Sequence, residues 1–313
     1  MTLHPQAEAF LKRMMLEHVP TVSVLSPIEA RKWDAKVTSF FTSSSEEVAR
    51  VENFTVAGPG GRIPVRVYTP VGDISNLLMY FHGGGWVLGN LDLVDLPCRL
   101  LANRTGRVVV SVDYRLAPEH KFPAAAEDCY AATKWVAENA DQFRGEEKAV
   151  AVCGDSAGGN LAAVVSLMAR DRSVPTIGDQ ILIYPITDLS DPNYKSFPDE
   201  LSPGLTRNDM QWFINHYISK NDDATNPYAS PIATSDLSDL PPALVITAEY
   251  DILLKQCNSY SDRLRNAGVP TTCSNYEGAI HGFFTLPDAF DTGRDAVGKI
   301  AEALSSNKRQ ESA

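Results

Sequence analysis

Short runs of almost wholly apolar residues recur along the chain and predict the strands of its core. A strand with no polar face is covered on both sides, which is typical of a parallel sheet packed between helices. Five such runs occur, at 77–81 (LLMYF), 108–112 (VVVSV), 149–153 (AVAVC), 181–184 (ILIY) and 243–247 (ALVIT). We expect these to be strands, together with a strand-like segment at 271–276 and a hairpin formed by 51–57 and 62–69.

Helical patterns separate the apolar runs. They cover about 123–140, 156–170, 254–267 and 289–305. This alternation of strand and helix predicts an α/β protein with a mostly parallel sheet. The first forty residues predict two more helices, one over 5–18 and one that begins after Ser26 and ends at about Phe40. Ser26 and Glu29 have the spacing of a capping box, with Pro27 at the first helical position.

One segment interrupts this alternation. Residues 190–230 are rich in Pro, Asn, Asp and Ser, and a helix opens inside them at Thr206. That helix carries Met210, Trp212, Phe213 and Tyr217. Insertions between strands often form lids over active sites. The segment is therefore predicted to lie near a functional site.

The acidic balance of the chain restricts its partners. The 313 residues carry 28 basic and 39 acidic side chains, for a formal net charge of −11. This charge argues against nucleic acid and anionic membrane as partners, although an acidic surface also serves solubility alone. We expect no signal peptide, because the first 18 residues have neither a long apolar run nor a small-residue cleavage site.

The cysteines favour a reducing compartment. Five are present, an odd number, and none forms a CxxC pair. This pattern predicts reduced thiols in a cytoplasmic protein and argues against a disulfide framework or a metal site. Nor does any segment approach the roughly 20 consecutive apolar residues of a membrane helix.

The strongest chemical signal is the sequence Gly154-Asp155-Ser156-Ala157-Gly158, which follows the run 149–153 and precedes a helix. It fits the nucleophile elbow G-x-S-x-G, in which a strained turn lifts the serine Oγ above the sheet. Side chains two residues before and two residues after the serine would collide with the neighbouring strand and helix. An ordinary glycine-rich turn is the alternative interpretation.

A serine hydroxyl becomes a strong nucleophile when a base removes its proton and a carboxylate orients that base. On an elbow fold the base follows the serine along the chain, which leaves His216 and His281. His281 follows the strand-like segment 271–276 and is the predicted base, whereas His216 lies in the insertion and is predicted to be structural. Asp251, after the run 243–247, is the predicted carboxylate, with Glu249 as the alternative.

A second glycine-rich loop, His82-Gly83-Gly84-Gly85-Trp86, directly follows the run 77–81. Backbone amides in such a loop can stabilise the negative charge of a tetrahedral intermediate. We predict an oxyanion hole formed by the amides of Gly83, Gly84 and Ala157, with His82 ordering the loop. A phosphate cradle is the alternative, but the loop lacks the Lys-Ser/Thr ending of a P-loop and is not G-x-G-x-x-G.

Together these motifs resemble the hormone-sensitive lipase family of bacterial esterases, in the branch with GDSAG at the elbow. The resemblance covers most of the chain from about residue 51 and includes the ordered motifs 82–85 (HGGG), 113–119 (DYRLAPE), 122–125 (FPAA), 154–160 (GDSAGGN), Tyr184-Pro185, Asp251 and 281–283 (HGF). One departure is Lys255, which stands where many relatives carry a second acid after the catalytic aspartate.

The resemblance implies an α/β-hydrolase fold with a helical cap. Residues 46–313 would form the catalytic domain, and residues 1–45 together with an inserted 190–225 would form the cap. It also implies hydrolysis of short-chain carboxylic esters without a cofactor, and dimers formed through an edge strand. The stretch 113–125 would order the oxyanion loop and the core.

The expected function is a serine carboxylesterase that works through an acyl-enzyme on a small-molecule ester. A hydrolase of another acyl bond (lipase, lactonase or amidase) and a ligand-binding protein without activity are the alternatives. Trp86, Trp212 and Phe213 are candidate pocket walls, and ordinary packing of the cap is the other interpretation for each. Activity is expected to fall below roughly pH 6.5 as the histidine base becomes protonated.

Overall fold

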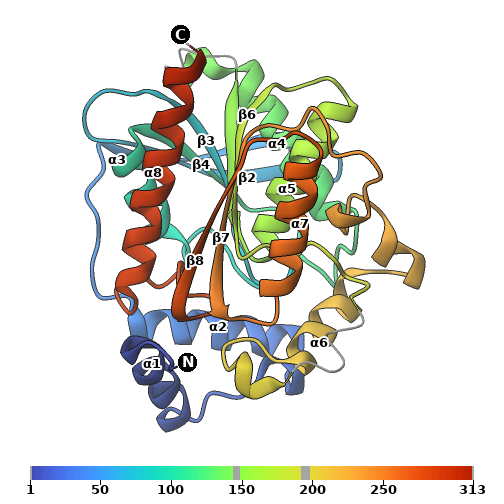
Figure 1. Ribbon diagram of the computed structural model, residues 1–313. Helices are drawn as coiled ribbons and strands as arrows, with labels where there is room; N and C mark the ends of the chain where they lie inside the picture. Colours follow the sequence, from blue (N-terminus) through green and yellow to red (C-terminus); the bar gives the residue numbers. More distant parts are fainter. Residues whose placement is uncertain (1, 144–148, 192–197, 312–313) are drawn as a thin grey trace.

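The computed structural model describes residues 2–143, 149–191 and 198–311. Its centre is one eight-stranded sheet with the order β1-β2-β4-β3-β5-β6-β7-β8 (Figure 1). The strands are β1 (Arg50–Gly58), β2 (Gly61–Thr69), β3 (Asn76–Phe81), β4 (Arg107–Val112), β5 (Val150–Asp155), β6 (Ile177–Ile183), β7 (Ala243–Tyr250) and β8 (Thr271–Ile280). All the strands predicted from the apolar runs and the hairpin are therefore present.

The sheet is mostly parallel. β1 and β2 form an antiparallel hairpin, and β2 also runs antiparallel to β4. Every other neighbouring pair, from β4 through β3 to β8, is parallel. Because these strands run the same way, their carboxyl ends and the loops that follow them meet at one edge of the sheet. The predicted α/β-hydrolase fold class is confirmed.

Two helical layers cover the sheet (Figure 1). One contains α3 and α8, and the other contains α4, α5 and α7. A third group, α1, α2 and α6, lies at one end of the sheet. The helices are α1 (Pro5–Leu16), α2 (Pro27–Phe41), α3 (Asp95–Thr105), α4 (Ala124–Glu138), α5 (Ala157–Asp171), α6 (Arg207–Tyr217), α7 (Leu254–Asn266) and α8 (Asp291–Glu311).

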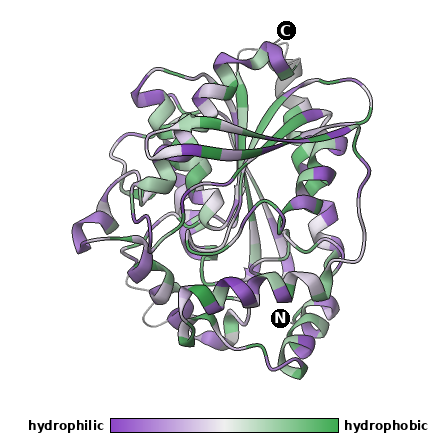
Figure 2. Ribbon diagram, turned by 180° about the vertical axis from the view of Figure 1, so that it is seen from behind, coloured by the Kyte–Doolittle hydropathy of each residue, from purple (hydrophilic) through white to green (hydrophobic). Residues whose placement is uncertain are grey.

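The central strands are apolar throughout because each serves two cores. Side chains on a strand point alternately to its two faces. In β3, Leu77, Met79 and Phe81 join the core cluster that also contains residues of α4 and α5, whereas Leu78 and Tyr80 join the cluster with residues of α3 and α8. Figure 2 shows the hydrophobic colouring concentrated in these central strands.

The second helix, α2, begins where the capping box in the sequence predicts. The Ser26 side chain accepts a hydrogen bond from Glu29 N, and the Glu29 carboxylate accepts one from Ser26 N. Pro27 occupies the first turn of α2, where its missing N–H costs nothing. α6 begins in the same way, with a capping box between Thr206 and Asp209.

α3 was not predicted from the sequence. Its N-cap position holds Val94, which makes no side-chain capping bond, and Pro97 stands near its start. Both features look like a loop in the sequence. The helix is stabilised by packing instead, because Leu96, Leu100 and Leu101 are buried against the sheet and α8. Across the described ranges, no helix combines the length and the apolar character that crossing a membrane requires.

Candidate active site

Ser156 occupies the sharp turn between β5 and α5. Its backbone has φ 55° and ψ −117°, a conformation that residues other than glycine rarely adopt. The flanking glycines permit the turn: a Cβ on Gly154 would lie 2.7 Å from the carbonyl oxygen of Phe81, and one on Gly158 2.7 Å from that of His82. These collisions are with backbone of the neighbouring strand β3 and its loop, as the sequence indicated. The turn places Ser156 at the wall of a cavity.

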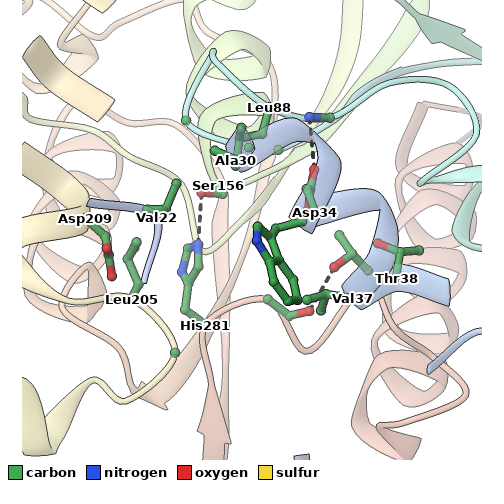
Figure 3. A pocket seen from close by; sticks show the side chains of 18 of the residues that line it. Val22, Ala30, Asp34, Val37, Thr38, Leu88, Ser156, Leu205, Asp209 and His281 are labelled. Atoms are coloured by element: carbon green, nitrogen blue, oxygen red, sulfur yellow. Dashed lines mark hydrogen bonds between the residues drawn. The ribbon is translucent and has the colours of Figure 1, made fainter. Parts of the chain in front are cut away.

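His281 and Asp251 meet Ser156 although they are far apart in the sequence. Ser156 Oγ and His281 Nε2 are 2.9 Å apart (Figure 3). His281 Nδ1 and Asp251 Oδ2 are 2.7 Å apart. Asp251 is 1% exposed, and its other oxygen accepts from Leu253 N at 2.9 Å. With Nδ1 donating to the buried carboxylate, Nε2 is free to accept the serine proton.

The alternative acid, Glu249, lies elsewhere. Its carboxylate accepts a hydrogen bond from Gly278 N at 2.8 Å. Gly278 lies in β8, two residues before the end of that strand. His216 also lies apart from the serine, because its Nδ1 is 2.8 Å from the carbonyl oxygen of Trp212 within α6. The geometry therefore selects Asp251 and His281 from the candidates that the sequence offered.

A buried carboxylate ties the glycine loop to the nucleophile turn. Asp155 Oδ1 accepts from the Tyr80 hydroxyl at 2.6 Å and from Gly83 N at 3.0 Å. Burial raises the pKa of Asp155 to about 6, while the Tyr80 hydrogen bond and the nearby His281 act in the opposite direction. Burial also raises the pKa of Tyr80 well above its usual value, so the phenol stays a donor.

His82 anchors the start of the same loop. Its ring stacks on Tyr114 at 4.3 Å between centroids, and the Tyr114 hydroxyl donates to the His82 carbonyl oxygen at 2.7 Å. Burial lowers the pKa of His82 to about 4, so the ring is neutral at physiological pH. The stretch 113–125 supplies further support, since Ala117 N donates to the Trp86 carbonyl oxygen at 2.9 Å.

One of the three amides predicted to form the oxyanion hole is not available, the amide of Gly83. Gly83 N already donates its hydrogen to Asp155, so Gly83 is not a free donor, contrary to the prediction. Gly84 and Gly85 follow it with φ of 101° and 57°, conformations that glycine adopts without strain. Their amides and that of Ala157 form no hydrogen bond within the described part of the chain. These three amides are the available donors.

A cavity of about 410 Å³ opens beside Ser156 and His281. Residues of the segments 82–94 and 281–290 line it on the side of the sheet, and two other parts of the chain lie over the nucleophile turn. Residues of α1, α2 and the short helix Val22–Val24 form one part, and residues 203–213 form the other. Most of the lining is apolar, which suits a small organic substrate. Figure 3 shows Val22, Leu205 and Val37 around the serine and histidine.

Of the three aromatic residues predicted to line the pocket, one does so and two do not. Phe213 lines the cavity, and its ring lies against Gly85. Trp86 does not: it is fully buried and stacks on Tyr217 with ring centroids 4.1 Å apart. Trp212 does not line it either, because its indole turns toward the N-terminal segment and donates to the Leu25 carbonyl oxygen at 3.1 Å. For these two tryptophans, packing of the helices is the correct interpretation.

Gly85 and Asp34 are among the lining residues that were not singled out from the sequence. The signal for Asp34 was present, because Ala30, Asp34 and Val37 share the spacing of one helix face. That face of α2 borders the cavity. An acid on an otherwise apolar stripe marks a position that packing alone does not explain.

Comparison with known proteins places the chain among ester hydrolases. Residues 78–285 match the family described as alpha/beta hydrolase fold. The carboxylic ester hydrolase LipN of Mycobacterium tuberculosis is 37% identical over 311 residues, which cover 97% of this chain and 82% of LipN. The ethyl acetate hydrolase of Pseudomonas putida is 31% identical, with 97% of this chain and 99% of that protein covered.

Solved structures of esterases are also similar to this chain. The hyperthermophilic esterase of the archaeon Pyrobaculum calidifontis superimposes with a TM-score of 0.92 at 44% sequence identity. The similarity covers 98% of this chain and 99% of that one.

Proposed function

The chain belongs to the α/β-hydrolase family and is a carboxylic ester hydrolase, and we propose that it cleaves short-chain esters through an acyl-enzyme on Ser156. One observation carries the proposal: the unbroken hydrogen-bonded series from Ser156 through His281 to Asp251, with the serine and histidine at the wall of the cavity. In this series Ser156 is the nucleophile, His281 is the base and Asp251 is the carboxylate that orients the base.

The catalytic cycle follows from this arrangement. His281 Nε2 takes the proton of Ser156 Oγ as the oxygen attacks the ester carbonyl. The amides of Gly84, Gly85 and Ala157 stabilise the oxyanion. His281 then returns the proton to the leaving alcohol, and in the second half it deprotonates the water that releases the acid. Asp251 holds the imidazole in the required tautomer and stabilises its protonated form.

The size of the cavity supports a short acyl chain. Its volume of about 410 Å³ lies toward the lower end of the range for small-molecule sites, roughly 300–1,000 Å³. The Phe213 ring against Gly85 further narrows the space near the oxyanion loop. The printed name of the Pseudomonas relative, an ethyl acetate hydrolase, points in the same direction.

We also propose that residues 1–45 and 190–225 act together as a cap on a catalytic domain formed by residues 46–313. Met1 and residues 192–197, 144–148 and 312–313 lie outside the described residues. In the described parts of the cap, hydrogen bonds join its two halves: Trp212 Nε1 donates to the Leu25 carbonyl oxygen at 3.1 Å, and Ser23 N donates to Asp209 Oδ1 at 3.1 Å.

An oligomeric state and a cellular location complete the proposal. A homodimer would form through β8, which ends the sheet and has one paired neighbour, β7. A cytoplasmic location is supported by the five cysteines, all of which are free thiols. Light scattering of the purified protein tests the dimer, and a monomeric mass at micromolar concentration would refute it.

Hydrolysis of p-nitrophenyl esters with two to about sixteen acyl carbons tests the activity. We expect the rate to peak at short chains and to vanish in Ser156→Ala and His281→Ala. His216→Ala is the matched control, a histidine of the cap that lies away from Ser156 and should retain most activity. A peak at long chains would assign a lipase, and full activity in Ser156→Ala would refute the mechanism.

A further inference from the structure

One carboxylate in the cavity has no part in the mechanism above. Asp34 lies on the face of α2 that borders the cavity, between Ala30 and Val37. Figure 3 shows it on the cavity wall with Ser156 and His281. Asp155, the residue before the nucleophile, lines the same cavity. A charge on Asp34 is therefore close enough to act on a bound substrate.

The orientation of Asp34 is fixed, and one of its oxygens is spare. Oδ2 accepts a hydrogen bond from Gly89 N at 3.2 Å. α2 is held at the same place by Arg31, whose Nε donates to the Val87 carbonyl oxygen at 2.8 Å. Within the described part of the chain, Oδ1 forms no hydrogen bond and Asp34 pairs with no Lys or Arg. A half-buried carboxylate with a spare oxygen is stabilised by a cation that reaches it.

The other acid on the cap side of the cavity is different. Asp209 uses both oxygens internally: Oδ1 accepts from Ser23 N, and Oδ2 accepts from the amide and hydroxyl of Thr206. It has a structural role and little capacity left for a ligand. Of these two acids, Asp34 is therefore the one with a carboxylate oxygen to spare in the described part of the chain.

The rest of the wall suits a cation. Among the described lining residues there is no Lys or Arg that would compete with a positively charged ligand or repel it. The neighbouring Trp33 also lines the cavity, and tryptophan faces attract cationic nitrogen. Exposed Lys36 already lies over this ring, 4.2 Å from its centroid, rather than pairing with Asp34.

We infer that Asp34 makes this cavity selective for esters that carry a positively charged nitrogen, such as a quaternary ammonium group. The inference rests on the proposed function and names a substrate class for it. Asp34 Oδ1 supplies the counter-charge, and Gly89 N fixes the carboxylate. The same arrangement disfavours esters with an anionic substituent.

Pairs of isosteric esters test the inference. Butyrylcholine is compared with its neutral isostere, in which tert-butyl replaces trimethylammonium, and this pair places the charge on the alcohol side. The methyl ester of γ-butyrobetaine and its tert-butyl isostere place it on the acyl side. In Asp34→Asn, the charged-to-neutral ratio of kcat/KM should fall about tenfold for at least one pair, the size expected for a partly screened ion pair.

Asp262→Asn is the matched control, because it removes an exposed acid, paired with Arg265, from the surface of α7. Its ratios should match those of the wild type. If Asp34→Asn leaves the ratios of both pairs unchanged, the inference is wrong. If it lowers both members of each pair equally, Asp34 serves only to position the loop through Gly89, and the inference is again wrong. Asp34→Ser is the second variant if Asp34→Asn does not fold.

Binding separates this inference from the proposed activity. The same pairs are titrated calorimetrically into Ser156→Ala and into Ser156→Ala/Asp34→Asn. A charge preference that is present in the first protein and lost in the second supports the inference even if no ester is hydrolysed. Equal affinities for the charged and neutral members in both proteins overturn it, whatever the rates are.

Discussion

Tyr80→Phe removes a single hydroxyl from the support of the oxyanion loop. That hydroxyl donates to Asp155 Oδ1 at 2.6 Å, and both residues are buried, with exposures of 0% and 3%. The carboxylate would keep the Gly83 amide as its donor. The phenyl ring keeps its packing against Phe284, so the change is confined to the hydrogen bond.

A hydrogen bond to a buried charged group contributes about 2 kcal/mol to stability. With an unfolding entropy of about 2.1 cal/mol/K per residue over 313 residues, the melting temperature should fall by roughly 3 °C. The activity should fall as well, because the loop carrying Gly84 and Gly85 loses part of its support. Complete loss of one oxyanion donor costs about 10²–10³ in kcat, so a looser loop should cost about tenfold.

Thermal unfolding followed by circular dichroism, together with kcat/KM on a short-chain p-nitrophenyl ester, checks both numbers. Tyr276→Phe is the matched control, since its hydroxyl donates to Asp295 Oδ2 at 2.7 Å on the surface. Solvent replaces that bond, so the control should lose about 0.5 kcal/mol at most. If the two variants have equal melting temperatures and wild-type rates, the view that Asp155 supports the loop is refuted.

Three other changes test the site and its surroundings. Gly158→Ala should prevent folding or abolish activity, because its Cβ meets only backbone of β3 and the glycine loop; Gly298→Ala, in α8 with open space around it, should instead raise the melting temperature slightly. Asp251→Asn should keep the fold and lower kcat about 10⁴-fold through the wrong histidine tautomer; a loss below tenfold would exclude it from the triad. Burial raises the pKa of Asp34 to about 6, so its contribution to stability is fully present below its unfolded pKa and is lost as the pH rises through about 6. Asp34→Asn should therefore raise the melting temperature more at about pH 7.5 than at about pH 4, and an equal effect at both would contradict this.

Much of the fold could be predicted because its signals are local. The apolar runs that became β3, β4 and β5 are continuous because both faces of these strands are buried. α2 and α6 begin with capping boxes that the sequence displays directly. α3 could not be predicted in this way, since its helical state depends on packing against α8 rather than on a cap or a stripe.

The site shows the same division. By itself, the sequence determined the chemistry: a serine between two glycines, a later histidine, an acid at the end of a strand and a glycine loop, each fixed by residue type and order. The tertiary structure decided which groups are free to act. It assigned the Gly83 amide to Asp155, turned Trp86 and Trp212 into packing residues, and placed Asp34 in the cavity. The physical reason is that the direction of an amide hydrogen and the partners of a carboxylate depend on atoms distant in sequence, and these meet only in the folded chain.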